Sequence, residues 1–109
     1  MTIISGSHRL VHRWFLDHPP RPGAGSAELR TSVHGHPYLR ELCTVGDVAA
    51  RIQRFHERVE ECDGIPLQVR ENTAAAGDVI LMHPLLLHAP ATAHLGSAPR
   101  FLLNKDIYL

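Results

Sequence analysis

Residues 77–103, GDVILMHPLLLHAPATAHLGSAPRFLL, decide which fold class the sequence favours. The segment opens with a Gly-Asp turn and a compact apolar run, which is typical of a buried strand. Pro84 interrupts this run, because proline cannot donate a hydrogen bond to a neighbouring strand. The stretch RFLLNKDIYL, residues 100–109, predicts a last strand. The end of the chain is therefore expected to consist of short strands.

Two other segments show the strand pattern. Residues 2–5, TIIS, are β-branched and stop at a glycine, so they predict the end of a strand. Residues 65–71, IPLQVRE, alternate apolar and polar side chains, as a half-buried strand does. The proline- and glycine-rich residues 19–26 predict a surface loop.

The helical period occurs in two places. Residues 7–18, SHRLVHRWFLDH, predict a short helix because their apolar side chains recur at helical spacing. Residues 44–64 form the clearest helical pattern, with Thr44 as a possible cap and Gly64 placed to end the helix. The apolar stripe of this helix consists of Val48, Ile52, Phe55 and Val59. The sequence as a whole predicts a mainly β fold with one or two helices.

The composition is that of a globular domain. With 109 residues the chain is long enough for one domain, and its 44% of apolar residues argues against a disordered chain. Eleven basic residues balance eleven acidic ones, so we expect no binding to nucleic acid or to an anionic membrane. No apolar run approaches the roughly 20 residues of a membrane span.

The compartment is inferred from the N-terminus and the cysteines. The start MTIISGSHR lacks the pattern of a signal peptide. Cys43 and Cys62 lie at opposite ends of the predicted helix, too far apart for a disulfide. Reduced thiols predict a cytoplasmic protein.

Candidate functional residues are concentrated near the C-terminus. Three of the nine histidines, His83, His88 and His94, lie in the apolar segment, and Arg100 follows them. From spacing alone, His83 and His88 are best interpreted as packing residues that bond to backbone carbonyls. Arg100 fits a solvent-exposed strand edge, but an inward orientation would require an anion to balance its charge.

Three motifs together carry a family resemblance. GDVILMHPLLLHA followed by PRFLL resembles the C-terminal part of the phytanoyl-CoA dioxygenase family. ISGSHR is similar to the PGSH segment of that family, and HPYLRELCTVGD with DGIPLQV resembles the intervening part of its bacterial members. The similarity runs over nearly the whole chain in the same order. It implies a double-stranded β-helix, a cupin-like jelly roll, that holds iron(II) and 2-oxoglutarate.

The resemblance also implies roles for individual residues. His88, the second histidine of HPLLLH, matches the distal iron ligand of a two-histidine, one-carboxylate site. Arg100 matches the arginine that pairs with the far carboxylate of 2-oxoglutarate, a role suited to a planar guanidinium. His83 matches no ligand and is expected in the core or behind the ligands. His94 stands where relatives often carry a Pro-Asn pair.

The other two iron ligands have no counterpart in the chain. The family carries them as an HxD pair shortly before PGSH, but no histidine here has a carboxylate two residues later. His34 and His36 would share one face of a strand, yet they follow the GSH segment, so the resemblance gives them no role as replacements. We therefore expect residues 1–109 to form a single partial domain, the C-terminal part of a jelly roll without its HxD strand.

Several functions follow as alternatives. The resemblance implies part of an iron(II)/2-oxoglutarate-dependent dioxygenase, an oxidoreductase that hydroxylates a small-molecule substrate of unknown identity. This chain alone is expected to be inactive, because His88 and Arg100 do not complete the iron site. The alternative is a non-catalytic binding or assembly module that forms a homodimer through exposed sheet edges. A third possibility is another metal site built from the histidines, such as zinc in a hydrolase.

Overall fold

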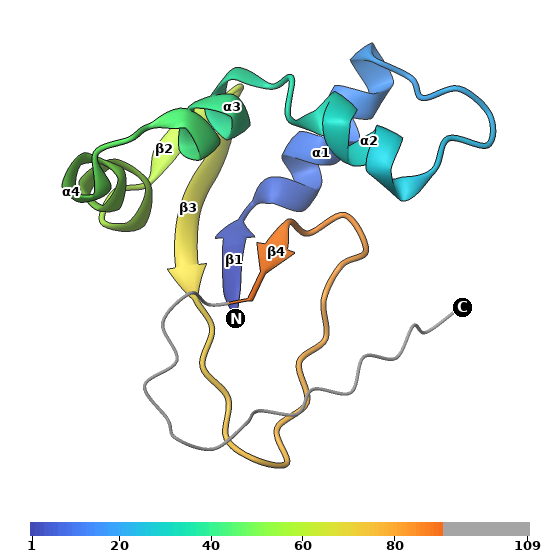
Figure 1. Cartoon of the computed structure of the whole chain (residues 1–109). Coiled ribbons are helices and arrows are strands. Elements are labelled where there is room, and N and C mark those ends of the chain that lie inside the picture. The colour runs from blue at the N-terminus through green and yellow to red at the C-terminus, as the bar shows by residue number, and fades with distance from the viewer. Residues whose placement is uncertain (91–109) are drawn as a thin grey trace.

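The computed structural model describes residues 1–90 of the chain. Within these residues, four strands form one antiparallel sheet in the order β2-β3-β1-β4 (Figure 1). The elements in chain order are β1 (Thr2–Ser5), α1 (Ser7–Asp17), α2 (Ser26–Val33), α3 (Pro37–Thr44), α4 (Val48–Arg51), the π-helix η1 (Ile52–His56), β2 (Glu60–Cys62), β3 (Ile65–Glu71) and β4 (His88–Ala89).

The described residues form a small α/β domain, which corrects the expectation of a mainly β fold with one or two helices. The additional helices α2 and α3 lie between residues 26 and 44, where the sequence showed no clear period. Each has only eight residues and buries one or two side chains, too few to produce a recognisable stripe. Pro37 starts α3, and the His36 side chain caps it by accepting a hydrogen bond from the Tyr38 amide.

The expected helix over residues 44–64 is broken into several elements. Thr44 ends α3, and the Asp47 carboxylate caps α4 by accepting a hydrogen bond from the Ala50 amide at 2.9 Å. Of the expected apolar stripe, only Phe55 is buried. The last residues form β2 because Asp63 and Gly64 have positive φ angles of 53° and 73° and turn the chain back into β3.

The prediction is correct for three segments and wrong for a fourth. Helix α1 and strands β1 and β3 form where the sequence placed them. Residues 77–82 form no strand, and residues 79–82 within them are exposed, Val79 by 83% and Leu81 by 81%. A short apolar run does not by itself show that the segment is a strand or that other elements bury it. The strand expected at residues 100–109 lies outside the described residues.

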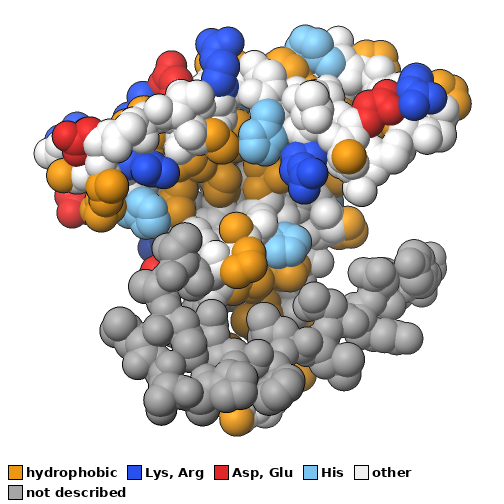
Figure 2. Space-filling view, viewed as in Figure 1, with side chains coloured by type: hydrophobic (Ala, Val, Ile, Leu, Met, Phe, Trp, Pro, Cys, Tyr) orange, Lys and Arg blue, Asp and Glu red, His pale blue; other side chains and the backbone are white. Residues whose placement is uncertain are grey.

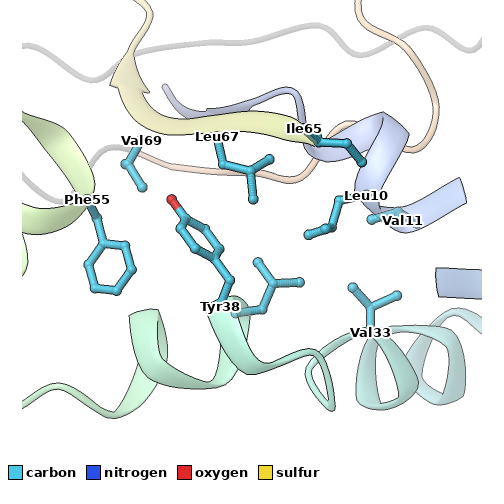
Figure 3. Close-up of a cluster of buried hydrophobic side chains, with 9 residues drawn as sticks. Leu10, Val11, Val33, Tyr38, Phe55, Ile65, Leu67 and Val69 are labelled. Atoms are coloured by element: carbon cyan, nitrogen blue, oxygen red, sulfur yellow. The ribbon is translucent and has the colours of Figure 1, made fainter. Parts of the chain in front are cut away.

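The core lies between one face of the sheet and the helices that cover it (Figure 3). Strand β3 points alternate side chains inward, whereas α1, α2, α3 and η1 each contribute one or two. Its buried members are Leu10, Val11, Val33, Tyr38, Leu39, Phe55, Ile65, Leu67 and Val69. Among residues 1–90 we find no helix with the length and apolar character needed to cross a membrane.

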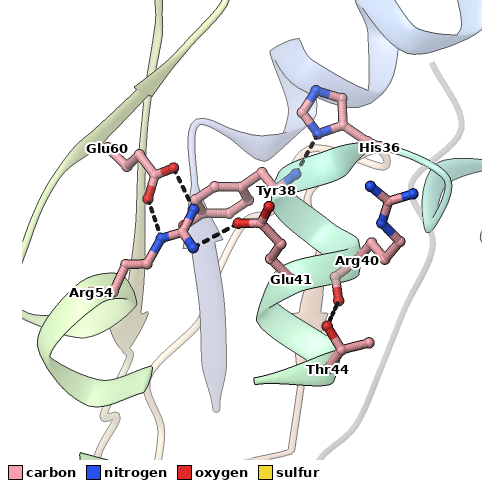
Figure 4. A network of polar contacts seen from close by, with 7 residues as sticks. All are labelled: His36, Tyr38, Arg40, Glu41, Thr44, Arg54 and Glu60. Atoms are coloured by element: carbon pink, nitrogen blue, oxygen red, sulfur yellow. Dashed lines mark hydrogen bonds and ion pairs between the residues drawn. The ribbon is translucent and has the colours of Figure 1, made fainter. Parts of the chain in front are cut away.

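Arg54 joins three elements on one side of this core (Figure 4). Its guanidinium donates two hydrogen bonds of 2.9 Å to Glu60 on β2 and lies 2.6 Å from the Glu41 carboxylate on α3. Hydrogen bonding from Arg54 lowers the pKa of Glu60 below its ordinary value of 4.5. The charged carboxylate therefore stabilises the folded chain above pH 4.5, and this contribution is lost as the pH falls through the lowered pKa.

Gly6 allows α1 to start directly after β1. Its φ angle is 83°, and a Cβ atom at this position would collide with the carbonyl oxygen of Pro66 on β3. Gly23 provides a comparison, because its φ of 79° is similar but its surroundings are open. Glycine is therefore needed at the first position of the GSH segment for two reasons: the positive φ angle and the close approach of the Pro66 backbone.

Replacing Gly6 by alanine is expected to lower the free energy of unfolding by about 3 kcal/mol, from left-handed strain plus the collision. Gly23→Ala should cost only about 1 kcal/mol, because it introduces the strain alone. Urea denaturation of both variants measures the difference. Equal losses would show that the contact with Pro66 does not limit this position.

The hydroxyl of Tyr38 is buried and has no hydrogen-bond partner among residues 1–90. Tyr38→Phe should leave stability unchanged or raise it by up to about 1 kcal/mol. Burial raises the pKa of Tyr38 from 10.0 to about 12, so the wild-type chain should lose stability as the pH rises through that interval. Thermal unfolding at pH 9 and pH 11 tests this. The stability advantage of Tyr38→Phe over the wild type should be larger at pH 11 than at pH 9. An equal difference at both pH values would contradict the burial of the hydroxyl.

Candidate functional site

The first and last strands of the described chain, β1 and β4, lie side by side. Ile3 on β1 pairs with His88 on β4, and the Ile4 amide donates a hydrogen bond of 3.0 Å to the Leu87 carbonyl. Figure 1 shows β4 beside β1, on the side away from β3. The strand that leads into the GSH segment is therefore the neighbour of the strand that carries the predicted iron ligand.

Side chains of the GSH segment reinforce this pairing. Ser7 is fully buried, and its Oγ accepts a hydrogen bond of 2.9 Å from the Leu87 amide. The ring of His8 lies against that of His83, with 5.1 Å between the ring centres. GSH and HPLLLH, which the sequence singled out separately, therefore contact each other twice besides the strand pairing.

His88 is exposed, and one of its ring nitrogens has a fixed partner. Its Nδ1 lies 2.9 Å from the carbonyl oxygen of Leu86. A carbonyl oxygen only accepts hydrogen bonds, so Nδ1 carries the proton and donates it. In the neutral ring, Nε2 then keeps a lone pair directed away from this contact. Histidines that bind metals are commonly oriented by such a bond from their other nitrogen.

His83 is arranged in the opposite way. Its Nδ1 accepts a hydrogen bond of 3.1 Å from the Leu85 amide, and its carbonyl accepts one of 2.9 Å from the Leu86 amide. These bonds form a tight turn around Pro84. Of the two positions expected for His83, the one in the core is wrong, because its side chain is exposed and lies against His8; a position behind the ligands stays a prediction.

His34 and His36 do not lie on a strand. His34 follows the last residue of α2, and His36 precedes the first residue of α3. His36 is buried, with Nε2 at 3.7 Å from the Asp63 carboxylate, whereas His34 is exposed with Nδ1 at 3.7 Å from the Cys43 Sγ. Strand geometry therefore does not place these two imidazoles on one face, as the alternative required.

The described residues contain no group of three or more histidine, cysteine, aspartate or glutamate side chains placed to hold a metal ion. His88 is the one predicted site residue within residues 1–90. Arg100 and His94 lie outside them. Sequence reasoning gave no role to Ser7, although it belongs to the quoted GSH segment, and it missed a cleft along α1 that is described below.

Comparisons with protein family models, with curated proteins and with solved structures find no match to this chain.

Replacing Ser7 by alanine should weaken the contact between the two motifs. The Leu87 amide would lose its acceptor in a buried position, which costs about 1–2 kcal/mol of unfolding free energy. Urea denaturation measures the loss, and hydrogen exchange of the Leu87 amide should become faster. Ser26→Ala, at the exposed first residue of α2, is the matched control and should change stability by less than about 0.5 kcal/mol. Unchanged exchange at Leu87 would contradict the contact.

Proposed function

We propose that this chain is the C-terminal part of an iron(II)/2-oxoglutarate-dependent dioxygenase of the phytanoyl-CoA dioxygenase type. In this proposal His88 is one iron ligand, and Arg100 pairs with the far carboxylate of 2-oxoglutarate. The observation that carries the proposal is the contact between GSH and HPLLLH, in which the buried Ser7 hydroxyl bonds to the Leu87 amide. Two motifs of one site must lie side by side, and these two do, although Ser7 and Leu87 are 80 positions apart in the sequence.

The orientation of His88 supports the ligand role. Because Nδ1 is bonded to the Leu86 carbonyl, Nε2 is the nitrogen available to iron, and neutral imidazole is a suitable donor for that metal. His88 supplies only one of three ligands. His88 is therefore suited to be one ligand of the iron, and the HxD pair would have to come from outside the described residues.

The position of β1 agrees with this arrangement. In the family the HxD pair comes shortly before the GSH segment, and here that segment follows β1 directly. A ligand set must surround one ion within a few ångströms. The pairing of Ile3 with His88 brings the chain before GSH next to the proposed ligand.

The finer fold is also part of the proposal. We propose that the sheet β2-β3-β1-β4 is one of the two sheets of a jelly roll. The exposed residues 79–82, Val-Ile-Leu-Met, support this, because four consecutive exposed apolar residues are what a strand of an incomplete second sheet would leave uncovered. Residues 1–109 would then be a partial domain.

The chemistry divides between the cofactors and the protein. Iron(II) and 2-oxoglutarate supply the oxidising chemistry that hydroxylates a C–H bond when both are bound. This chain would hold one face of the metal through Nε2 of His88 and fix the cosubstrate through the guanidinium of Arg100. The substrate would be a small molecule, and we place the protein in the cytoplasm, where Cys43 and Cys62 remain free thiols.

A second candidate function rests on the exposed run at residues 79–82 and on the two-residue edge strand β4. A second copy of the chain that covered both would form a homodimer with an assembly role and no catalysis. Light scattering separates the candidates, because this alternative requires a discrete dimer that is unaffected by iron.

The proposal predicts weak metal binding at His88 and no turnover by this chain alone. Manganese(II), a paramagnetic substitute for iron(II), should broaden the NMR signals of His88 most strongly when 2-oxoglutarate is present. His88→Ala should abolish this effect, whereas His56→Ala, a partly exposed histidine on η1, should leave it intact.

Succinate release with iron(II) and 2-oxoglutarate is the accompanying assay, and it should stay at background. Broadening that is no stronger at His88 than at other exposed histidines would contradict the ligand role. Sustained succinate release that requires His88 would contradict the incomplete site.

A further inference from the structure

A cleft of about 440 Å³ runs along α1, apart from His88. Figure 2 shows histidine and arginine side chains beside apolar ones on the face where α1 and the segment before β4 lie. The volume is in the range of small-molecule sites. Its lining residues are His8, Arg9, His12, Arg13, Leu16, Ile65 and His83.

The polar lining of the cleft is basic. His8 and His12 are four positions apart, as are Arg9 and Arg13, so each pair lies along one side of α1. No carboxylate lines the cleft within the described residues, and neither arginine forms an ion pair there. Two permanent positive charges therefore face the same space without compensation from that part of the chain.

Arg13 is held in place by the protein. Its Nη1 donates a hydrogen bond of 2.5 Å to the carbonyl oxygen of Asp63, in the turn between β2 and β3. This contact uses one of the five N–H donors of the guanidinium and leaves the others for a ligand. The ring of His83, which also lines the cleft, lies against that of His8 on α1.

We propose that this cleft binds the phosphoryl group of a small organic phosphate. Two guanidinium groups offer more N–H donors than the two oxygens of a carboxylate accept, whereas a phosphoryl group presents three oxygens and up to two charges. Leu16 and Ile65 give the cleft an apolar part that suits the organic portion of the ligand. The cleft includes neither His88 nor Arg100, the residues proposed to hold iron and 2-oxoglutarate, and phosphate binding there does not require either of them.

Backbone NMR titrations of the iron-free chain test the site with inorganic phosphate and with phenyl phosphate. Saturable shifts should be confined to the first two turns of α1 and to the residues around His83. Phenyl phosphate should bind about fivefold more tightly than inorganic phosphate because its ring is partly buried. Sodium acetate and sodium chloride at the same ionic strength should produce weaker effects that do not saturate.

Two variants localise the effect. Arg9→Ala and Arg13→Ala should each weaken phosphate binding about tenfold, the loss of one charge-assisted contact. Arg30→Ala, an exposed arginine on α2, is the matched control and should bind like the wild type. Arg9 is exposed, so its variant should keep the wild-type spectrum and remain a valid test. Shifts spread over all arginines, equal responses to chloride, or unchanged binding in both cleft variants would overturn the proposal.

Discussion

The pairing of β1 on both its edges is the interaction on which the rest of the structure depends. All four of its residues pair with β3 on one side, and Thr2 and Ile3 also pair with β4 on the other. Both partners are distant in sequence, so β1 closes the longest loops of the described chain, and such pairings carry the largest entropic cost. Gly6 and Ser7 offset that cost. Gly6 allows the backbone to approach Pro66, and Ser7 gives the Leu87 amide a buried acceptor.

The elements that could be predicted are those whose pattern is local. Strand β3 alternates buried and exposed residues, and α1 packs Leu10, Val11, Trp14 and Phe15 against the core at helical spacing, so the sequence predicts both elements. Helices α2 and α3 could not be found because each is short and its few buried contacts come from tertiary packing. The prediction of one helix over residues 44–64 is wrong because Asp63 and Gly64, a typical hairpin signal, form the turn between β2 and β3 and do not end a helix.

Much less of the candidate site was predictable. The resemblance selects His88, but only the fold places it beside Ile3 and bonds its Nδ1 to the Leu86 carbonyl. The spacing of Arg9 and Arg13 is visible in the sequence. The cleft that they line together cannot be inferred from this spacing, because His83 also lines it. His83 is distant in sequence and belongs to the turn around Pro84. Contacts between distant segments therefore account for what sequence reasoning missed.

The contact between the GSH and HPLLLH segments is tested most directly by nuclear Overhauser effects across β1 and β4. Ile4 and Leu87 share a ladder hydrogen bond, so Ile3 and His88 form the adjacent non-hydrogen-bonded pair, with Cα atoms about 4.5 Å apart. A strong effect between the Hα atoms of Ile3 and His88 is the predicted result. A well-dispersed spectrum in which Ile3 shows no effect to His88, or pairs with another segment, would contradict the arrangement and the function proposed from it.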